Sequence, residues 1–539
     1  MKTRNSALVT FAGGAVGVVM RQIVAATIGA VPAAAQSDPV RAVPVSAPDA
    51  PEQAVWQSEP HLNVIPRTEA ESARIDAVTR PADDFSAPEP FEQNPGGAAT
   101  TRFIDTAEAF SQFSPNMPFE HELDFKVGNG IFRKLWVGAP SSTKGSDGLG
   151  PLYNARACQN CHIKDGRGHL PDGPDDSRVS AFLRLSVMGG DDIPAIPGYI
   201  PTLPDPVYGG QLQDLSLEGY LAEAKMGVAW TESTVTLADG EAVTLRRPHY
   251  SIDSPAYGAP DEGLLISPRV APQMIGLGLI EAIPAADIIA RADPGDADGD
   301  GISGRPQIVW SSEFGQPMLG RFGHKAGNAT IREQSASAFA GDMGLSTPLF
   351  PDPSGECTET QSDCRSAPPG QEPGIRDGLE VDTEALDLVT FYSRNLAVPE
   401  RRNLDDPQVL RGKEIAYSIG CTSCHSPKYV TNRLKDQPEQ SFQLIWPYSD
   451  LLLHDMGEGL ADNRPESRAT GREWRTAPLW GISLNKQVTG TESYLHDGRA
   501  RTLLEAILWH GGEAETARNA VTELPKEDRD ALIAWLKSL

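Results

Sequence analysis

The hydrophobic positions of the chain follow helical spacing most clearly in its C-terminal part. In DTEALDLVTFYSRNL (382–396), apolar residues recur every three or four positions, and a proline soon afterwards ends the predicted helix. The pattern then predicts a helix in PQVLRGKEIAYSI (407–419), another from Thr502 to His510, and a closing helix at the C-terminus. We therefore expect a domain boundary near residue 400 and a compact helical unit over residues 401–539.

The preceding part of the chain has a less regular pattern. Between residues 101 and 400, short apolar runs alternate with Gly and Pro clusters, which predicts loops, modest helices and a hairpin around TLADGEAVTL. Residues 36–100 are rich in Pro, Ala, Ser and acidic side chains and predict an extended, disordered tether. These features suggest one large unit over residues 101–400, enlarged by loops and small β insertions.

The N-terminus has the pattern of an export signal. Basic residues precede an apolar run, and a second run of small residues leads to AAAQ, a cleavage-like site after Ala35. Arg21 interrupts the apolar span, which favours a removed signal peptide at residues 1–35 over a retained membrane helix. Translation could start at Met1 or at Met20. We expect an exported, periplasmic protein whose mature form has no integral membrane segment.

The net charge indicates which partners the chain can bind, and the cysteine spacing indicates an oxidising compartment. A formal net charge of -26 disfavours nucleic acid and anionic membranes as partners, because like charges repel at long range. The same charge would attract a small basic redox protein. Cys357 and Cys364 lie in a polar loop where an oxidising compartment favours a disulfide, with two free thiols as the alternative.

The remaining four cysteines form two CxxCH motifs, CQNCH (158–162) and CTSCH (421–425). This spacing lets two thiols reach the vinyl groups of one haem while the adjacent imidazole lies beneath the iron. Zinc binding is the alternative, but a His directly after each second Cys fits a closed tetrahedral site poorly. We therefore expect two covalently bound haem c groups, and a mainly α fold of two cytochrome c-like haem domains. The expected haem-binding residues are Cys158, Cys161, His162, Cys421, Cys424 and His425.

The sixth position of each iron decides whether the haem only transfers electrons or also binds a small oxidant. His510, at the end of an apolar helix and before two glycines, is the candidate ligand for the second haem. The alternative is a His favoured there by the helix dipole. For the first haem, His324, His169 and His121 are candidates, and an open position is at least as well supported.

Longer motifs resemble a known family. The segments GPLYNARACQNCHIKDGRG, GRFGHKAG, SDLLLHDMG and HDGRARTLLEAILWHGGEA are similar to di-haem oxidoreductases often labelled thiol oxidoreductase-like, which are related to bacterial di-haem cytochrome c peroxidases. The resemblance covers roughly residues 125–539. His510 occupies the position of a Met in the peroxidases, so this chain departs toward bis-histidine ligation by His425 and His510, which should lower the potential of that haem.

The resemblance implies a peroxidase-type activity. Electrons would pass from a basic cytochrome or cupredoxin through the C-terminal haem to the N-terminal haem, where a peroxide or similar small oxidant is reduced. The stretch APQMIGLGLIEAIP resembles the segment that supplies a Gln and a catalytic Glu, which makes Gln273 and Glu281 the counterparts. A solvent-exposed Glu is the alternative. A non-enzymatic electron carrier and a haem- or iron-handling accessory protein are the other functions that these motifs allow.

Two further groups of residues suggest ligand contacts. Asp296, Asp298 and Asp300 in DPGDADGDGISG repeat the first half of a calcium loop, although the usual distal Glu is missing. Calcium binding and a bare acidic turn both remain open. Arg499 and Arg501 follow the HDG turn and could pair with haem propionates, because guanidinium groups suit forked contacts with carboxylates. Surface arginines are the alternative.

Overall fold

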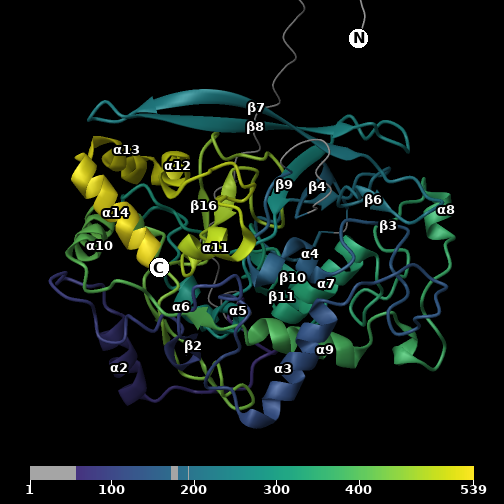
Figure 1. The fold of residues 1–539 in the computed structure, drawn as a ribbon, viewed down its shortest axis with the longest axis horizontal. Helices are drawn as coiled ribbons and strands as arrows, with labels where there is room; N and C mark the ends of the chain where they lie inside the picture. The colour runs from purple at the N-terminus through teal and green to yellow at the C-terminus, as the bar shows by residue number, and fades with distance from the viewer. Residues whose placement is uncertain (1–55, 172–179, 192) are drawn as a thin grey trace, which may run out of the picture. The chain divides into compact units, whose positions relative to one another are not determined.

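The computed structural model describes residues 56–171, 180–191 and 193–539 (Figure 1). The predicted signal peptide and the first part of the predicted tether, up to residue 55, lie outside these residues. No helix within the described ranges is both long enough and apolar enough to cross a bilayer.

The fold mixes helices with many small sheets. The prediction of a mainly α fold was wrong, because only 28% of the described residues are helical while 18% form strands. Two long segments, KMGVAWTESTVT and AVTLRRPHYSID, account for much of the difference. They are rich in Val, Thr and aromatic residues, which favour pleated strands over helices.

The helices and strands have the following bounds. The helices are α2 (Glu69–Thr79), α3 (Glu122–Phe132), α4 (Cys158–Cys161), α5 (Leu277–Glu281), α6 (Ala285–Ile289), α7 (Ile331–Met343), α8 (Ser362–Arg365), α9 (Thr383–Arg394), α10 (Pro407–Ser418), α11 (Asn485–Thr489), α12 (Leu503–Leu508), α13 (Glu515–Glu523) and α14 (Lys526–Ser538). The strands are β1 (Val64–Ile65), β2 (Thr100–Thr101), β3 (Leu152–Tyr153), β4 (Ala181–Met188), β5 (Thr202–Leu203), β6 (Leu215–Ser216), β7 (Lys225–Thr236), β8 (Ala242–Asp253), β9 (Leu265–Val270), β10 (Ile308–Ser311), β11 (Gln316–Leu319), β12 (Val398–Pro399), β13 (Tyr429–Val430), β14 (Arg433–Leu434), β15 (Leu444–Ile445), β16 (Leu453–Asp455) and β17 (Glu473–Arg475).

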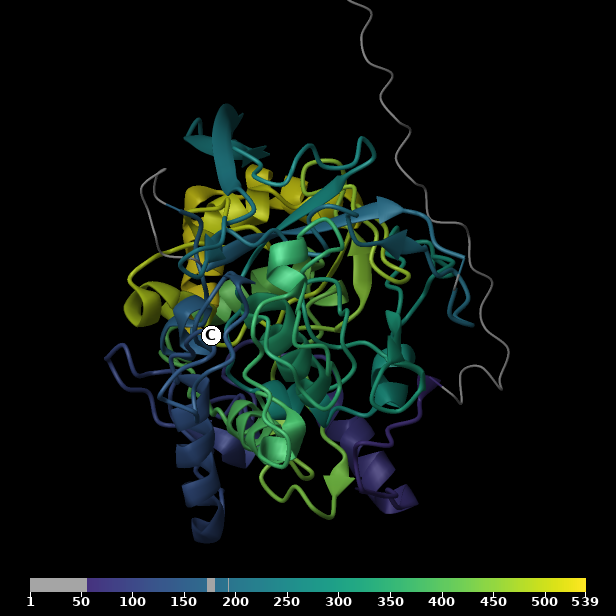
Figure 2. The same cartoon turned by 90° about the vertical axis from the view of Figure 1, so that its right-hand side faces the viewer.

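Strands β7 and β8 form the hairpin predicted around TLADGEAVTL, which is thereby confirmed. Both views show this hairpin over the C-terminal helices, drawn in yellow (Figures 1 and 2). Leu237 and Leu245 pack into the same hydrophobic cluster as the C-terminal helices, and Arg529 of α14 pairs with Asp239 and Glu241 at the turn. The hairpin therefore connects the middle of the chain to its C-terminal helices.

The predicted tether is folded from residue 56 onward, which corrects that prediction for residues 56–100. Trp56 is 3% exposed and belongs to the largest hydrophobic cluster. Helix α2 begins at a capping box in which Thr68 and Glu71 bond each other's backbone amides, and β1 pairs with β14. This region therefore packs against residues that lie more than 300 positions later in the chain.

The two predicted haem domains share packing. The largest hydrophobic cluster contains Phe110 and Ile275 from the first, and Ile445 and Trp480 from the second. In the second, helix α10 leads toward the CTSCH motif and packs against α14. A disulfide joins Cys357 and Cys364, which confirms the predicted pairing.

Candidate di-haem site

Both CxxCH motifs line one continuous cavity of about 810 Å³. Cys158 and Cys161 begin and end the single turn of α4, and Cys421 opens a 3-10 turn that follows Gly420. Gly420 has a φ of 88°, a conformation that is costly for residues with a side chain. The backbone thus turns abruptly before the second motif and directs its side chains into the same cavity as those of the first.

The histidines of the two motifs are oriented alike. His162 Nδ1 donates to the Pro272 carbonyl oxygen at 2.7 Å, and His425 Nδ1 donates to the Tyr448 carbonyl oxygen at 2.8 Å. A bond at Nδ1 fixes the tautomer and leaves Nε2 as the ligand atom. Burial lowers the pKa of each imidazole to about 4, so both are neutral at physiological pH, as metal ligation requires.

His510 lies on the same cavity as His425. It follows α12, and its Nδ1 donates to the Ala506 carbonyl oxygen at 2.8 Å, which again leaves Nε2 for a ligand. After burial and the hydrogen bond to Tyr448, the next influence on the pKa of His425 is His510, which lowers it. The two imidazoles are therefore close enough to interact electrostatically.

His162 has a different environment. Within the described part of the chain, burial lowers its pKa and the Pro272 carbonyl raises it, with no contribution from another histidine. His324 lines the cavity, but its Nε2 donates to the Val270 carbonyl oxygen at 2.8 Å. His169 and His121 are not among the described residues that line the cavity, and each bonds elsewhere, to the Leu170 carbonyl and to Glu439.

Buried cations test whether this cavity suits a haem. Arg167 lines the cavity, and its Nε and Nη2 atoms are buried without a hydrogen-bond partner. Arg475 also lines it and donates only to the backbone carbonyls of Gly323 and Thr476 among the described contacts. Burial lowers the pKa of both guanidinium groups to about 10. Unpaired buried cations of this kind call for an anion, and haem propionates would supply one.

The two arginines predicted for that role have protein partners. Arg499 pairs with Asp497 at 2.8 Å and donates to the Gly459 carbonyl, while Arg501 pairs with Glu505 at 3.0 Å. Neither is among the described residues that line the cavity. Sequence reasoning missed Arg167, although it lies in a quoted motif, and Arg475, because only the fold reveals which guanidinium groups lack a carboxylate.

The two residues expected for acid–base chemistry are separated. Gln273 lines the cavity, where its Nε2 donates to the Trp480 carbonyl oxygen at 2.6 Å. Glu281 is completely buried, is not among the described cavity residues, and accepts bonds from Arg394 and from the Ile331 amide. Burial alone would raise the pKa of Glu281, but Arg394, His61 and the Ile331 amide together outweigh it and hold the pKa below its usual value. These contacts are those of a structural ion pair.

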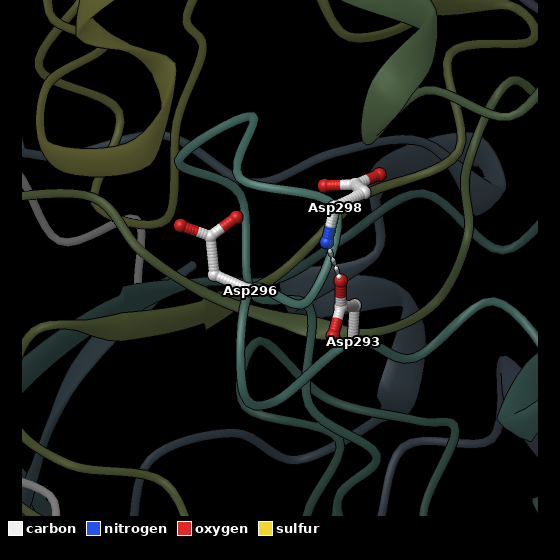
Figure 3. Close-up of side chains that lie close together, drawn as sticks. All are labelled: Asp293, Asp296 and Asp298. Carbon is white, nitrogen blue, oxygen red and sulfur yellow. Dashed lines mark hydrogen bonds between the residues drawn. The ribbon is translucent and has the colours of Figure 1, made fainter.

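The acidic loop brings a partly different set of carboxylates together. Asp293, Asp296 and Asp298 have ligand atoms within 4.8 Å of one another, and the Asp298 amide donates to Asp293 (Figure 3). Asp300 instead lines the haem cavity. Asp293 was missed because it lies outside the alternating DADGD pattern.

A buried ion network touches the second CxxCH motif. His454 lies between Asp450 and Glu513, at 2.9 and 2.7 Å, and its Nδ1 is 3.6 Å from the Cys424 sulfur. Burial lowers the pKa of His454, but the two carboxylates outweigh it and raise the pKa well above its ordinary value. His454 is therefore an imidazolium beside the second haem-binding motif.

Two cysteine–histidine motifs on one cavity, with unpaired arginines beside them, define a protein that holds two haems. A family model described as "Di-haem oxidoreductase, putative peroxidase" matches residues 91–539. The chain therefore belongs to this di-haem oxidoreductase family. A comparison with curated proteins finds no match.

Proposed function

We propose that the chain is an exported, peroxidase-type oxidoreductase with one haem attached covalently at each CxxCH motif. Cys158, Cys161 and His162 would hold the first, and Cys421, Cys424 and His425 the second. When bound, such haems supply one-electron transfer and the reduction of a peroxide or similar small oxidant. The shared cavity supports this assignment because it brings both motifs to one internal space.

The proposal rests on the difference between the surroundings of His425 and those of His162. His510 faces the same space as His425 and has a free Nε2, so it would complete a bis-histidine site suited to electron transfer. Among the described residues, no other histidine influences the pKa of His162, which favours an open position for a small oxidant. Electrons would therefore enter at the haem site of His425 and be used at the haem site of His162.

Asp342 is a better candidate for holding a proton than Glu281. It lines the cavity, and its Oδ1 accepts a bond from Gln211 Nε2 at 2.8 Å. Burial raises the pKa of Asp342, and Asp342 in turn raises the pKa of both Cys158 and Cys161, so it is close to the first motif. A carboxyl group that lines the cavity and has a raised pKa is suited to hold and release a proton there.

The expected electron donor is a small basic redox protein. Helix α13 covers the second site, because Thr516, Ala517 and Val521 line the cavity, and it exposes Glu515 and Glu523 to solvent. Together with the net charge of -26, these carboxylates favour a cationic partner at this helix. The disulfide and the N-terminal pattern support export to the periplasm. We also propose a calcium ion at Asp293, Asp296 and Asp298, which supply the oxygen atoms that this ion prefers.

The test is a low-temperature electron paramagnetic resonance spectrum of the ferric protein with and without hydrogen peroxide. We expect one low-spin signal and one high-spin signal, and only the high-spin signal should change with peroxide. Replacing His510 by alanine should add a second high-spin signal, while His169→Ala is the matched control and should not. Two low-spin signals indifferent to peroxide, in both the oxidised and the half-reduced protein, would contradict the proposal and indicate a simple electron carrier.

A further inference from the structure

Aromatic rings link the first haem-binding motif to the surface. The ring centroid of Phe132 lies 6.2 Å from that of His162, and the ring centroid of Tyr392 lies 5.2 Å from that of Phe132. Phe125 continues the series at 4.8 Å from Tyr392, and Phe113 follows at 5.8 Å, where its side chain is 37% exposed. The series comes from the α3 and α9 helices, which pack against each other, and the loop before α3.

Tyr392 differs from the other members because it can lose an electron together with a proton. It is 1% exposed, and its hydroxyl donates to Asp165 Oδ1 at 2.7 Å. Asp165 Oδ2 accepts a second bond from the Ser111 hydroxyl at 2.5 Å. Burial raises the pKa of Asp165 to about 6, so the group is mostly ionised at pH 7 and is already in position to receive the phenolic proton.

Burial, and then the Asp165 carboxylate, raise the pKa of Tyr392 far above its usual range. The phenol therefore stays protonated at physiological pH. Oxidation without a base would leave a buried cation, which is costly in an apolar interior. The Asp165 carboxylate removes that obstacle because the proton can move along an existing hydrogen bond.

We propose that Tyr392 is a redox-active tyrosine that transiently supplies an electron to the haem site at His162. This inference rests on the proposed peroxidase function. Reduction of one peroxide to two waters takes two electrons and two protons from solvent. One electron comes from the donor through the second haem, and the other from Tyr392. The O–H bond of Tyr392 breaks, its proton moves to Asp165 Oδ1, and a neutral tyrosyl radical remains until the donor returns the electron and the proton goes back.

The experiment mixes the fully loaded ferrous–ferric protein with one equivalent of hydrogen peroxide, freezes it, and records paramagnetic resonance and optical spectra. We expect an organic radical whose hyperfine pattern changes in protein made with ring-deuterated tyrosine. Tyr392→Phe should lose this signal. Tyr208→Phe is the matched control, because Tyr208 is equally buried but donates to the Gly258 carbonyl instead of a carboxylate, and it should retain the signal.

The outcomes separate this inference from the proposed function. Haem spectra that change with peroxide, combined with no tyrosine radical or with one that persists in Tyr392→Phe, would overturn the role of Tyr392 alone. Haem spectra indifferent to peroxide would overturn the proposed function. A photochemically generated ruthenium(III) tris-bipyridine oxidant then replaces peroxide, and a tyrosine radical that disappears in Tyr392→Phe supports the redox-active pair. Its absence, or a radical elsewhere, overturns it.

Discussion

Replacing Arg167 by methionine should affect the stability of the haem-free and haem-loaded proteins in opposite directions. Arg167 Nε and Nη2 are buried without partners, and burial lowers the pKa of this guanidinium to about 10. Compared with the ordinary arginine value, that lowering corresponds to a cost of about 3 kcal/mol for keeping the charge. Without haem, methionine should remove most of this cost and raise the free energy of unfolding by a similar amount.

With haem bound, Arg167 would pair with a propionate. Removing one partner of a buried ion pair costs roughly 3–5 kcal/mol, so the same substitution should then destabilise the protein. The assay is urea unfolding of both forms, with the haem-free chain obtained by expression without the haem-attachment machinery. Arg499→Met is the control, because Arg499 pairs with Asp497 inside the protein, and it should destabilise both forms. If Arg167→Met destabilises the haem-free chain or leaves the loaded protein unchanged, Arg167 is no propionate partner.

Three other predictions concern packing, acid stability and metal binding. Gly412→Ala would bring a Cβ within 2.0 Å of a backbone oxygen of α14 and should cost about 1–3 kcal/mol in urea unfolding, whereas Gly130→Ala, with open space around it, should be neutral or slightly stabilising. Burial alone would raise the pKa of Glu466, but Arg269 and its neighbours hold it at about 2. Glu466 therefore contributes about 3 kcal/mol to the free energy of unfolding at a pH above its pKa in the unfolded chain, and this contribution is lost as the pH falls toward 2. We expect Glu466→Gln to lose less stability than the wild type when the pH is lowered, as measured by urea unfolding at several pH values. Calcium should raise the thermal midpoint of the wild type but not of Asp298→Asn, and equal shifts in both would exclude this loop as the site.

The features that could be predicted are those whose chemistry is contiguous in the sequence. Each CxxCH motif carries its thiols and imidazole within five residues, and the nearby Cys357 and Cys364 can pair across a short loop. A hairpin was likewise expected from the short apolar runs around TLADGEAVTL, and its turn lies at Asp239 and Gly240, where Asp-Gly suits a tight turn. Each of these requires only residues that are neighbours along the chain.

The features that could not be predicted depend on distant partners. Arg499 and Arg501 looked suitable for propionates until the fold brought Asp497 and Glu505 against them, while Arg167 and Arg475 have no carboxylate partner among the described residues. Glu281 was similarly expected in the cavity and is bound by Arg394. A sequence shows which side chains can ionise, but tertiary packing decides which of them remain unpaired.

The proposed difference between the two haem sites must therefore come from residues outside the motifs. Both CxxCH segments supply two thiols and one imidazole, and both histidines donate Nδ1 to a backbone carbonyl. A fixed proximal side leaves the opposite side of each site as the variable. His510 is near enough to His425 to lower its pKa, whereas ring contacts from Phe132 to Tyr392 adjoin His162. We therefore expect the site at His425 to pass electrons on and the site at His162 to use them.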